Sequence, residues 1–385
     1  MITVTDKSLC CGCTACVAVC PVQCIVMRRD AEGFDYPVAN PDICIGCGKC
    51  CQVCPMDKPR QASGPLRSWA AKNMAESYGS SSGGIFPAVA SGVLDGGGAV
   101  FGAAFQDVRT VGHEEVDVIE GLDALKGSKY VQSDMYSCYE DVRECLEAGR
   151  RVLFSGTPCQ VAGLGAFLSK DYEGLVCVDC ACHGVPGPGL WGKYVDALER
   201  KYGAKVEAVN FRDSSKGWQK YHICLKLADG RLIRTPKDDD PYMSLFFQDV
   251  TLRPSCYNCR FRSMRSGSDI TVADLWSVAR IAPEMADGNG VSLVTANTAK
   301  GLEIMESLDI YRKETDWRDA SEGNGGFASE TVVPARRGQF FSGLPYASEL
   351  IPYMKSFVVR KPLAVRMYRS LHTALSRARA KFFKK

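Results

Sequence analysis

The chain has 385 residues, of which 46% are hydrophobic and 24% are charged, a balance typical of a globular protein with two or three domains. Its first residues, MITVTDKS, lack the basic and then apolar pattern of a secretion signal. The longest apolar stretch, residues 85–105, is interrupted by Pro87, Asp95 and three glycines, which argues against a membrane span. We therefore expect a cytoplasmic protein.

The formal net charge of +3 conceals an uneven distribution. Residues 355–385 hold ten Lys or Arg and no acidic residue, so removing these ten charges leaves −7 on the rest of the chain. Apolar residues of this tail recur near one helical face, at Leu363, Met367, Leu371, Leu375 and Phe382. The pattern predicts a basic amphipathic helix in peripheral contact with an anionic membrane. The alternative is docking on the acidic remainder of the chain or on a partner subunit.

Two cysteine runs near the N-terminus share one spacing. Eleven of the 20 cysteines precede residue 55, and the runs are Cys10-x2-Cys13-x2-Cys16-x3-Cys20-Pro21 and Cys44-x2-Cys47-x2-Cys50-x3-Cys54-Pro55. This is the spacing of bacterial two-cluster ferredoxins, in which the fourth cysteine of each run ligates the other cluster. We predict one [4Fe–4S] cluster on Cys10, Cys13, Cys16 and Cys54, and a second on Cys44, Cys47, Cys50 and Cys20.

Other uses of these thiols explain the spacing less well. Disulfides are rare in a reducing cytosol, and adjacent cysteines would form strained bridges. A pair of zinc knuckles is the alternative, but it leaves the third close cysteine and the Cys-Pro ending unexplained. The spare cysteines Cys11, Cys24 and Cys51 are expected to be small buried hydrophobic residues beside the clusters.

After a polar linker at about residues 57–64, the pattern becomes one of strand, loop and helix. Residues 151–154 predict a strand, followed by a turn and a helix from Cys159, and residues 175–182 and 189–202 repeat the arrangement. Alternation on both sides of Asp229-Gly230 predicts a β-hairpin. The fold expected is an α+β two-cluster ferredoxin-type domain at 1–60, a mixed α/β flavin-binding domain with a β-rich insertion at 65–310, and a C-terminal extension at 311–385.

The body resembles the coenzyme F420 hydrogenase/dehydrogenase beta-subunit family. The matching stretches are SSSGGIFPAVASGVLDGG, GSKYVQS, VLFSGTPCQVAGL, CHGVPGPGLWGKY, FRDSSKGW, SCYNCRFRSMRSGSDITVADLW and GVSLVTANTAKG. With the ferredoxin part, the resemblance covers about residues 1–310 and is nearest to bacterial members found beside polysaccharide-assembly enzymes. It implies a flavin (FAD in known members), an additional iron–sulfur cluster, and electron exchange with a soluble carrier or a substrate. It does not settle the use of F420.

Four body cysteines lie inside these family-like motifs. Cys159 opens a helix, where the helix dipole favours a thiolate, Cys182 ends a strand, and Cys256-x2-Cys259 lies in an Arg-rich loop. These four residues predict a third [4Fe–4S] cluster, with Cys180 as a substitute for Cys182. The alternative is a zinc-like or vacant CxxC pair and two isolated thiols. The remaining cysteines are expected in the core, at Cys138, Cys145, Cys177 and Cys224.

Three turns are candidates for binding flavin phosphates, which need backbone N–H groups and positive charge near a helix start. They are Ser82-Gly83-Gly84 with the preceding Ser81, Ser128-Lys129-Tyr130, and Ser155-Gly156-Thr157. Lys129 would neutralise a phosphate while Tyr130 stacks on a ring. No GxGxxG fingerprint is present, so a standard dinucleotide site is not supported.

These features predict an iron–sulfur flavoprotein oxidoreductase that moves electrons between the clusters, a flavin and a small-molecule or carrier substrate. The resemblance suggests polysaccharide biosynthesis as its context. The alternative is a non-catalytic electron-transfer subunit of a separate enzyme. An iron–sulfur sensor is disfavoured, because the sequence has no visible nucleic-acid-reading motif apart from the tail.

Two groups of polar residues are further candidates for this site. His183 is the candidate catalytic residue, as a proton donor near the flavin, and the alternative is a histidine that caps a strand end. Five charged residues line an anionic pocket or form internal ion pairs, namely Arg212, Asp213, Arg262, Arg265 and Asp274.

Overall fold

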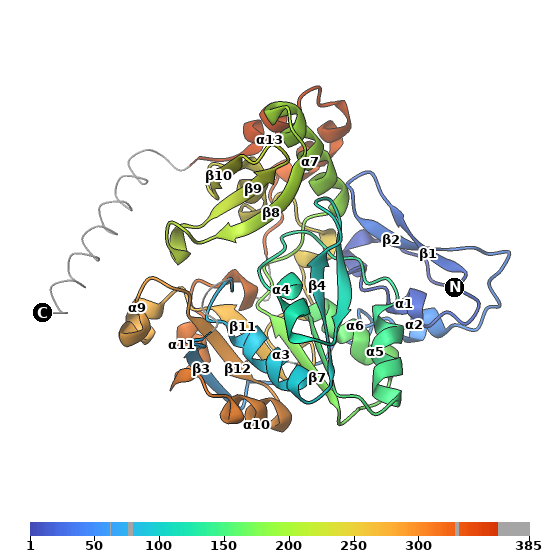
Figure 1. Ribbon diagram of the computed structural model, residues 1–385. Helices are drawn as coiled ribbons and strands as arrows, with labels where there is room; N and C mark the ends of the chain where they lie inside the picture. Colours follow the sequence, from blue (N-terminus) through green and yellow to red (C-terminus); the bar gives the residue numbers. More distant parts are fainter. Residues whose placement is uncertain (62, 76–79, 328–330, 361–385) are drawn as a thin grey trace, which may run out of the picture.

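The computed structural model describes residues 1–61, 63–75, 80–327 and 331–360 (Figure 1). The basic tail helix predicted from residue 361 onward lies outside these residues. Within them, every helix is too short or too polar to cross a membrane. The apolar stretch at 85–105 forms helix α3 (Ile85–Asp95) and strand β4 (Ala99–Phe105), separated by the glycines.

The N-terminal domain is a small α+β unit with an internal repeat. Each cysteine run forms a loop and a one-turn helix, α1 (Ala15–Ala18) and α2 (Lys49–Gln52). Strands β1 (Ile25–Arg29) and β2 (Asp35–Ala39) pair antiparallel between the two runs. This is the ferredoxin-type arrangement that the cysteine spacing predicts.

A mixed sheet of eight strands forms the centre of the body, in the order β13-β3-β12-β11-β7-β6-β4-β5. The strands not yet given are β3 (Arg67–Lys72), β5 (Val111–Val116), β6 (Val152–Gly156), β7 (Leu175–Cys180), β11 (Ile270–Asp274), β12 (Ser292–Ala296) and β13 (Tyr311–Glu314). The neighbours β4, β6, β7 and β11 run parallel, and the outer strands pair antiparallel. Their carboxyl ends therefore meet at one edge, where parallel sheets usually bind ligands.

Apolar cores cover both faces of this sheet. On one face, α3 packs against Val100, Leu153 and Val176. On the other, Phe101 and Phe154 belong to a core that also holds thiols of the N-terminal domain. Figure 1 shows that domain against the side of the body formed by α5 and α6. The helices beside the sheet are α4 (Leu122–Leu125), α5 (Cys138–Glu147), α6 (Pro158–Leu168), α9 (Val278–Ile281), α10 (Ala299–Ser307) and α11 (Trp317–Ala320).

The β-rich part predicted from the sequence is a separate antiparallel sheet between β7 and β11 in the chain. It consists of β8 (Val206–Asp213), β9 (His222–Leu227) and β10 (Leu232–Pro236), with a turn at Gly230, whose φ of 87° favours glycine. Its helices are α7 (Pro188–Tyr202), α8 (Pro241–Phe247), α12 (Arg336–Gly343) and α13 (Leu350–Phe357). Aromatic rings fill the core between them. The centroid of the Trp191 ring lies 4.9 Å from that of Phe211 and 5.0 Å from that of Tyr242.

Candidate functional site

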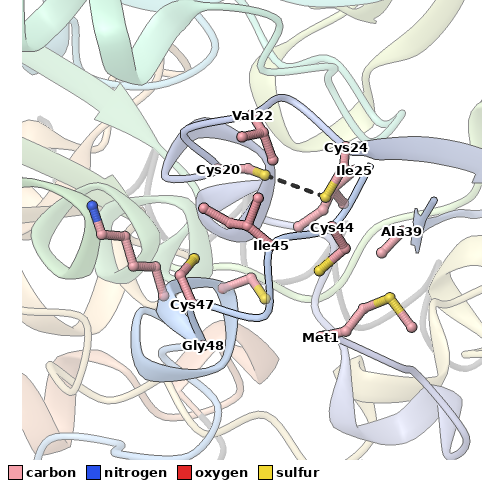
Figure 2. A pocket seen from close by; sticks show the side chains of 12 residues that line it. Met1, Cys20, Val22, Cys24, Ile25, Ala39, Cys44, Ile45, Cys47 and Gly48 are labelled. Carbon is pink, nitrogen blue, oxygen red and sulfur yellow. Dashed lines mark hydrogen bonds between the residues drawn. The ribbon is translucent and has the colours of Figure 1, made fainter. Parts of the chain in front are cut away.

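Four N-terminal cysteines line one cavity at the surface of the molecule (Figure 2). We name Cys20, Cys44, Cys47 and Cys50 the outer thiol set. The cavity holds about 330 Å³, counting its part open to solvent, and its other lining residues are mainly apolar. Ile45 is 64% exposed, so little protein covers this side of the cavity. The structure thus brings together the four ligands that the sequence assigned to one cluster.

A fifth thiol, that of Cys24, lies in the same cavity. Its Sγ is 3.5 Å from the Sγ of Cys20, and its thiol also interacts with Cys44. The ferredoxin spacing does not include Cys24 among the cluster ligands. Cys24 is buried, as the sequence predicts. The prediction that Cys51 is buried was wrong, because it lies on the outward side of the short helix α2, beside buried Cys50.

The four cysteines predicted to hold the other N-terminal cluster face the body. We name Cys10, Cys13, Cys16 and Cys54 the inner thiol set. Burial raises the pKa of Cys16 to about 12, and the neighbouring Cys10 and Cys54 thiols add to the rise. A Cβ built on Gly163 of α6 would lie 2.9 Å from the Cβ of Cys13, so helix and loop are in close contact. The inner set therefore lies at the boundary between the two domains.

The four body cysteines converge in space. We name Cys159, Cys182, Cys256 and Cys259 the body thiol set. Burial raises the pKa of Cys256, and the other three thiols of the set are its next largest influences. Cys259 interacts with Cys159 and Cys182, which also interact with each other. Every pair in the set is thus within electrostatic range, so the alternative of an isolated CxxC pair and two separate thiols does not describe this arrangement.

Element ends place these four thiols at the carboxyl edge of the sheet. Strand β6 leads into α6, and the Thr157 and Gln160 side chains form a capping box that fixes the first turn and hence Cys159. Strand β7 ends at Cys180, and Cys182 follows two residues later. Cys180 is exposed but its thiol contacts that of Cys182, so it stays a candidate substitute.

Cys11 connects the inner and body sets. Its buried thiol interacts with both Cys13 and Cys159. Sequence spacing alone treats Cys11 as a spare residue, because its partner lies almost 150 positions away in the chain. The signal that would have found it is the Cys-Cys pair itself, which turns one thiol to each side of the loop.

The described residues do not show the geometry of a single metal ion. No three His, Cys, Asp or Glu side chains among them converge as the ligands of one ion would. A zinc site needs thiolates about 2.3 Å from the ion, whereas the thiolates of an iron–sulfur cube surround the whole cluster.

Two of the three predicted phosphate turns meet each other. The Ser128 backbone N–H donates to Ser81 Oγ at 2.8 Å, and the two hydroxyls are 3.0 Å apart. Trp218 Nε1 donates to the Ser81 carbonyl at 3.0 Å. The turn before α3 and the turn before Tyr130 thus form one polar junction beside the small sheet.

Several polar groups of these turns already have protein partners. Ser82 Oγ donates to the Val291 carbonyl, and the Gly83 N–H donates to Ser292 Oγ. Gly84 precedes α3 with a φ of 73°, which favours glycine. Lys129 Nζ donates to the carbonyls of Ala124 and Lys126 at the end of α4, at 2.9 and 2.8 Å.

The third turn has a different role. The Ser155 carbonyl contacts His113 Nε2 at 3.1 Å, and Gly156 ends β6. Thr157 Oγ1 is 3.2 Å from Cys159 Sγ, and it caps α6. No contact of these three residues with the Ser81–Ser128 junction is present in the described part of the chain, so the turn belongs to the body thiol set.

A buried guanidinium lies near the Ser81–Ser128 junction. Arg212 is 7% exposed, and its Nη1 donates to Asp274 at 2.6 Å, as the ion-pair alternative predicts. Its Nε and Nη2 have no partner among the described residues. The guanidinium lies 4.6 Å from the Tyr221 ring and 5.4 Å from the Trp276 ring. Tyr130 is also an electrostatic neighbour of this arginine.

The remaining charged candidates lie elsewhere. Asp213 accepts from Arg234 at 2.6 Å. Arg262 and Arg265 donate to carbonyls of the loop that carries the body thiols, those of Cys256 and Cys259, each at 3.1 Å. His183 Nε2 is 2.8 Å from Asp249 Oδ1, and its ring packs 5.1 Å from that of Phe246. His183 is therefore one residue from Cys182 and in contact with a carboxylate.

A second cavity separates the N-terminal hairpin from the body. It holds about 790 Å³ including its open part, and its polar lining includes Thr14, Arg29, Arg109 and Gln132. Gly12 also lines it, so the cavity reaches the loop of the inner thiol set.

Comparison with known proteins finds matches in both parts of the chain. Residues 149–315 match the family model for the C terminus of the coenzyme F420 hydrogenase/dehydrogenase beta subunit. Residues 9–58 and 36–92 match two models described as 4Fe-4S dicluster domains. No curated protein matched the chain. Among solved structures, the F420-reducing [NiFe] hydrogenase complex from Methanosarcina barkeri aligns at 13% identity over 74% of this chain and 95% of that chain, with a TM-score of 0.47.

The thiol sets and the matched domains agree in kind and in position. The dicluster domain contains the outer and inner sets, and the C-terminal domain contains the body set. These findings describe an iron–sulfur protein of the electron-transferring, oxidoreductase type. Residues 149–315 of the chain therefore carry the C-terminal domain of the coenzyme F420 hydrogenase/dehydrogenase beta-subunit family, and a 4Fe–4S dicluster domain lies ahead of it.

Proposed function

We propose that the chain is a flavin-dependent iron–sulfur oxidoreductase in which three [4Fe–4S] clusters lead from the protein surface to a flavin in the body. The observation that carries the proposal is the shared core in which Cys11 and Cys13 pack with Cys159, which joins the inner and body thiol sets. When bound, such clusters pass single electrons and the flavin exchanges electron pairs with a substrate or carrier. The chain's own residues supply the ligands and the order of the three sets.

The order follows from burial. The outer set opens to solvent through a cavity with few covering side chains. The inner set packs into the core that also contains Phe154 and Phe261 of the body. The body set lies at the carboxyl edge of the large sheet, the usual ligand edge of parallel strands. This arrangement suits electron entry at the N-terminal domain and use in the body.

The flavin part rests on the Ser81–Ser128 junction and on Arg212. The Nε and Nη2 atoms of the buried Arg212 guanidinium have no hydrogen-bond partner among the described residues. Because buried polar groups are usually hydrogen-bonded, we expect a bound group to supply an acceptor there. Aromatic rings beside it, those of Tyr221 and Trp276, suit a planar partner. An electron-rich edge of a flavin ring, or one of its phosphates, meets both requirements. His183 with Asp249 is the candidate proton donor.

The test is the content of iron, acid-labile sulfide and flavin per chain in protein purified without oxygen. About twelve irons and one flavin support three clusters and a flavin. About eight irons and no flavin would leave only the N-terminal clusters and overturn the body part. An Arg212→Gln variant that kept its irons but lost the flavin would support a flavin site beside Arg212.

A second candidate function is an electron-transfer subunit for a separate enzyme. It is favoured by exposed apolar residues beside the outer set, Ile43 and Ile45, which suit contact with a partner protein. The family's description also names a subunit. The discriminating measurement is turnover of small-molecule acceptors by the purified chain with dithionite as electron source. Turnover supports the enzyme, and its absence in a chain with full iron and flavin supports the subunit. Neither result tests a place in polysaccharide biosynthesis, which stays a proposal from the sequence.

A further inference from the structure

Two arginines are buried against thiol sets without a carboxylate partner. Arg253 and Arg262 are each 1% exposed, among the most buried large side chains of the molecule. Within the described residues, neither is paired with a carboxylate, and their hydrogen-bond acceptors are carbonyl, amide or hydroxyl oxygens and, for Arg253, the Cys10 sulfur. A buried charge is costly unless a counter-charge is near. The thiols of Cys10 and Cys11 are electrostatic neighbours of Arg253, and the thiol of Cys182 is an electrostatic neighbour of Arg262.

Arg253 is the better placed of the two, because it reaches across the domain boundary. Its Nε donates to the Cys10 carbonyl at 2.8 Å, and its Nη2 lies 3.7 Å from Cys10 Sγ. Nη1 donates to Gln132 Oε1 at 3.0 Å, and the Tyr36 ring lies 4.2 Å from the guanidinium. These contacts fix a positive charge on the ligand side of the inner set.

The outer set lacks such a charge. Its cavity is lined by Met1, Val22, Ile25 and similar apolar residues, and its one lysine, Lys49, is exposed. Water and salt screen an exposed charge far more than a buried one. The two N-terminal sets therefore share a cysteine spacing but differ in their electrostatic surroundings.

We propose that Arg253 is a positioning residue that raises the reduction potential of the inner centre above that of the outer centre and so favours electron flow toward the body. This inference rests on the proposed function, in which both sets hold clusters. Reduction adds one negative charge to a cluster, and a buried cation stabilises the reduced form more than the oxidised form. Net charge and hydrogen bonds to sulfur are known determinants of cluster potential.

A structural alternative exists, in which Arg253 only fastens the domains together. Arg337 provides the matched control, because it also crosses this boundary. It binds Glu32 through two hydrogen bonds, of 3.0 and 2.5 Å, and none of its contacts is a cysteine. Arg337→Gln removes a boundary arginine without altering the charge beside Cys10.

The experiment compares the full-length wild type with Arg253→Gln, Arg253→Lys and Arg337→Gln. Each protein is purified without oxygen, its iron is counted, and its clusters are titrated with a reductant while their paramagnetic resonance spectra are recorded. A Cys47→Ser variant identifies the signal of the outer centre, because it removes a ligand of that set only.

In Arg253→Gln we expect the ratio of reduced to oxidised inner centre, at a fixed potential, to fall tenfold or more. For a one-electron centre this is a fall of about 59 mV or more. The outer centre should not shift, and Arg253→Lys and Arg337→Gln should keep the wild-type value. Loss of the inner irons in Arg253→Gln alone would also support the proposal, since the charge would then be needed to hold an anionic centre.

Three results would overturn the inference. They are an unchanged inner potential in Arg253→Gln with full iron, an equal fall in Arg337→Gln, and a fall in Arg253→Lys as large as in Arg253→Gln. Absence of clusters from the wild type is distinguishable from these, because it would overturn the proposed function itself.

Discussion

The outer and body thiol sets each bring four cysteines together, but one is formed by a short stretch of the chain and the other by distant elements. The outer set comes from one short region, residues 20–50, in which loops and one-turn helices carry the thiols to a surface cavity. The body set comes from the ends of separate elements between residues 159 and 259, and it exists only when the large sheet has formed. The difference shows that a local site depends on spacing, whereas a distributed site depends on the whole fold. Changes in the body should therefore damage one set and spare the other.

The largest effect is expected from the double variant Cys256→Ala with Cys259→Ala. It removes two of the four ligands of the body set, so about four of about twelve irons per chain should be lost. The N-terminal irons should remain, because their ligands belong to another domain. Iron and sulfide analysis of anaerobic protein provides the measurement. Cys138→Ala is the control, since Cys138 is buried without a thiol neighbour. Loss of all irons in the double variant would contradict the independence of the two regions.

A second prediction tests the contact between the regions. In Gly163→Leu, the new side chain would meet Tyr139 Oη at 2.6 Å and Cys13 Cβ at 2.9 Å, so α6 must move away from the inner set. Such overpacking typically costs about 1–3 kcal/mol of unfolding free energy. Gly165→Leu on the same helix is the control, because nothing lies within 4 Å of its Cβ position. Denaturant unfolding checks the expectation. Because leucine is a better helix former than glycine, Gly165→Leu should not lose stability, and equal unfolding free energies in the two variants would contradict the close contact of α6 with the inner set.

A third prediction concerns pH and the body alone. Burial lowers the pKa of His113 to about 4, against an ordinary value of about 6.5. Between these values the unfolded chain binds a proton that the folded chain does not, so stability should fall as pH decreases from 7 to 5. The linkage relation gives a loss of about 2 kcal/mol over this range. Urea unfolding at both pH values checks it. In His113→Gln this part of the pH dependence should be absent, and an unchanged slope would show that another group causes it.

These effects also indicate which features a sequence can reveal. The outer and inner sets follow from spacing, because three ligands on one loop need no knowledge of the fold. The ends of β6 and β7 follow from strand and turn patterns, which place Cys159 and Cys182 at one edge. Convergence of these two with the Cys256 loop needs the strand order, and a pattern of residues along the chain does not specify it.

Other features could not be predicted for the same reason. The thiol of Cys11 interacts with that of Cys159, and Arg253 Nη2 lies 3.7 Å from Cys10 Sγ, each across a boundary that only the packing of the two domains creates. The serine and glycine turns gave three equal candidates for a phosphate site. Only the contacts of Ser81 with Ser128, and of Thr157 with α6, separate them. Such contacts depend on tertiary distances that no local propensity encodes.

The smallest effect is expected from Cys51→Ser, and it tests how local the outer set is. Cys51 and Cys47 are both exposed and lie four residues apart, but only Cys47 lines the cavity in Figure 2. An exposed substitution away from the ligands usually changes stability by no more than about 0.5 kcal/mol. Cys51→Ser should therefore keep all irons and its unfolding midpoint, whereas Cys47→Ser should lose about four irons or show a changed outer signal. If Cys51→Ser lost iron to the same extent, both the spacing and the cavity would have misled the assignment, and Cys51 would have to be counted among the ligands of the outer set.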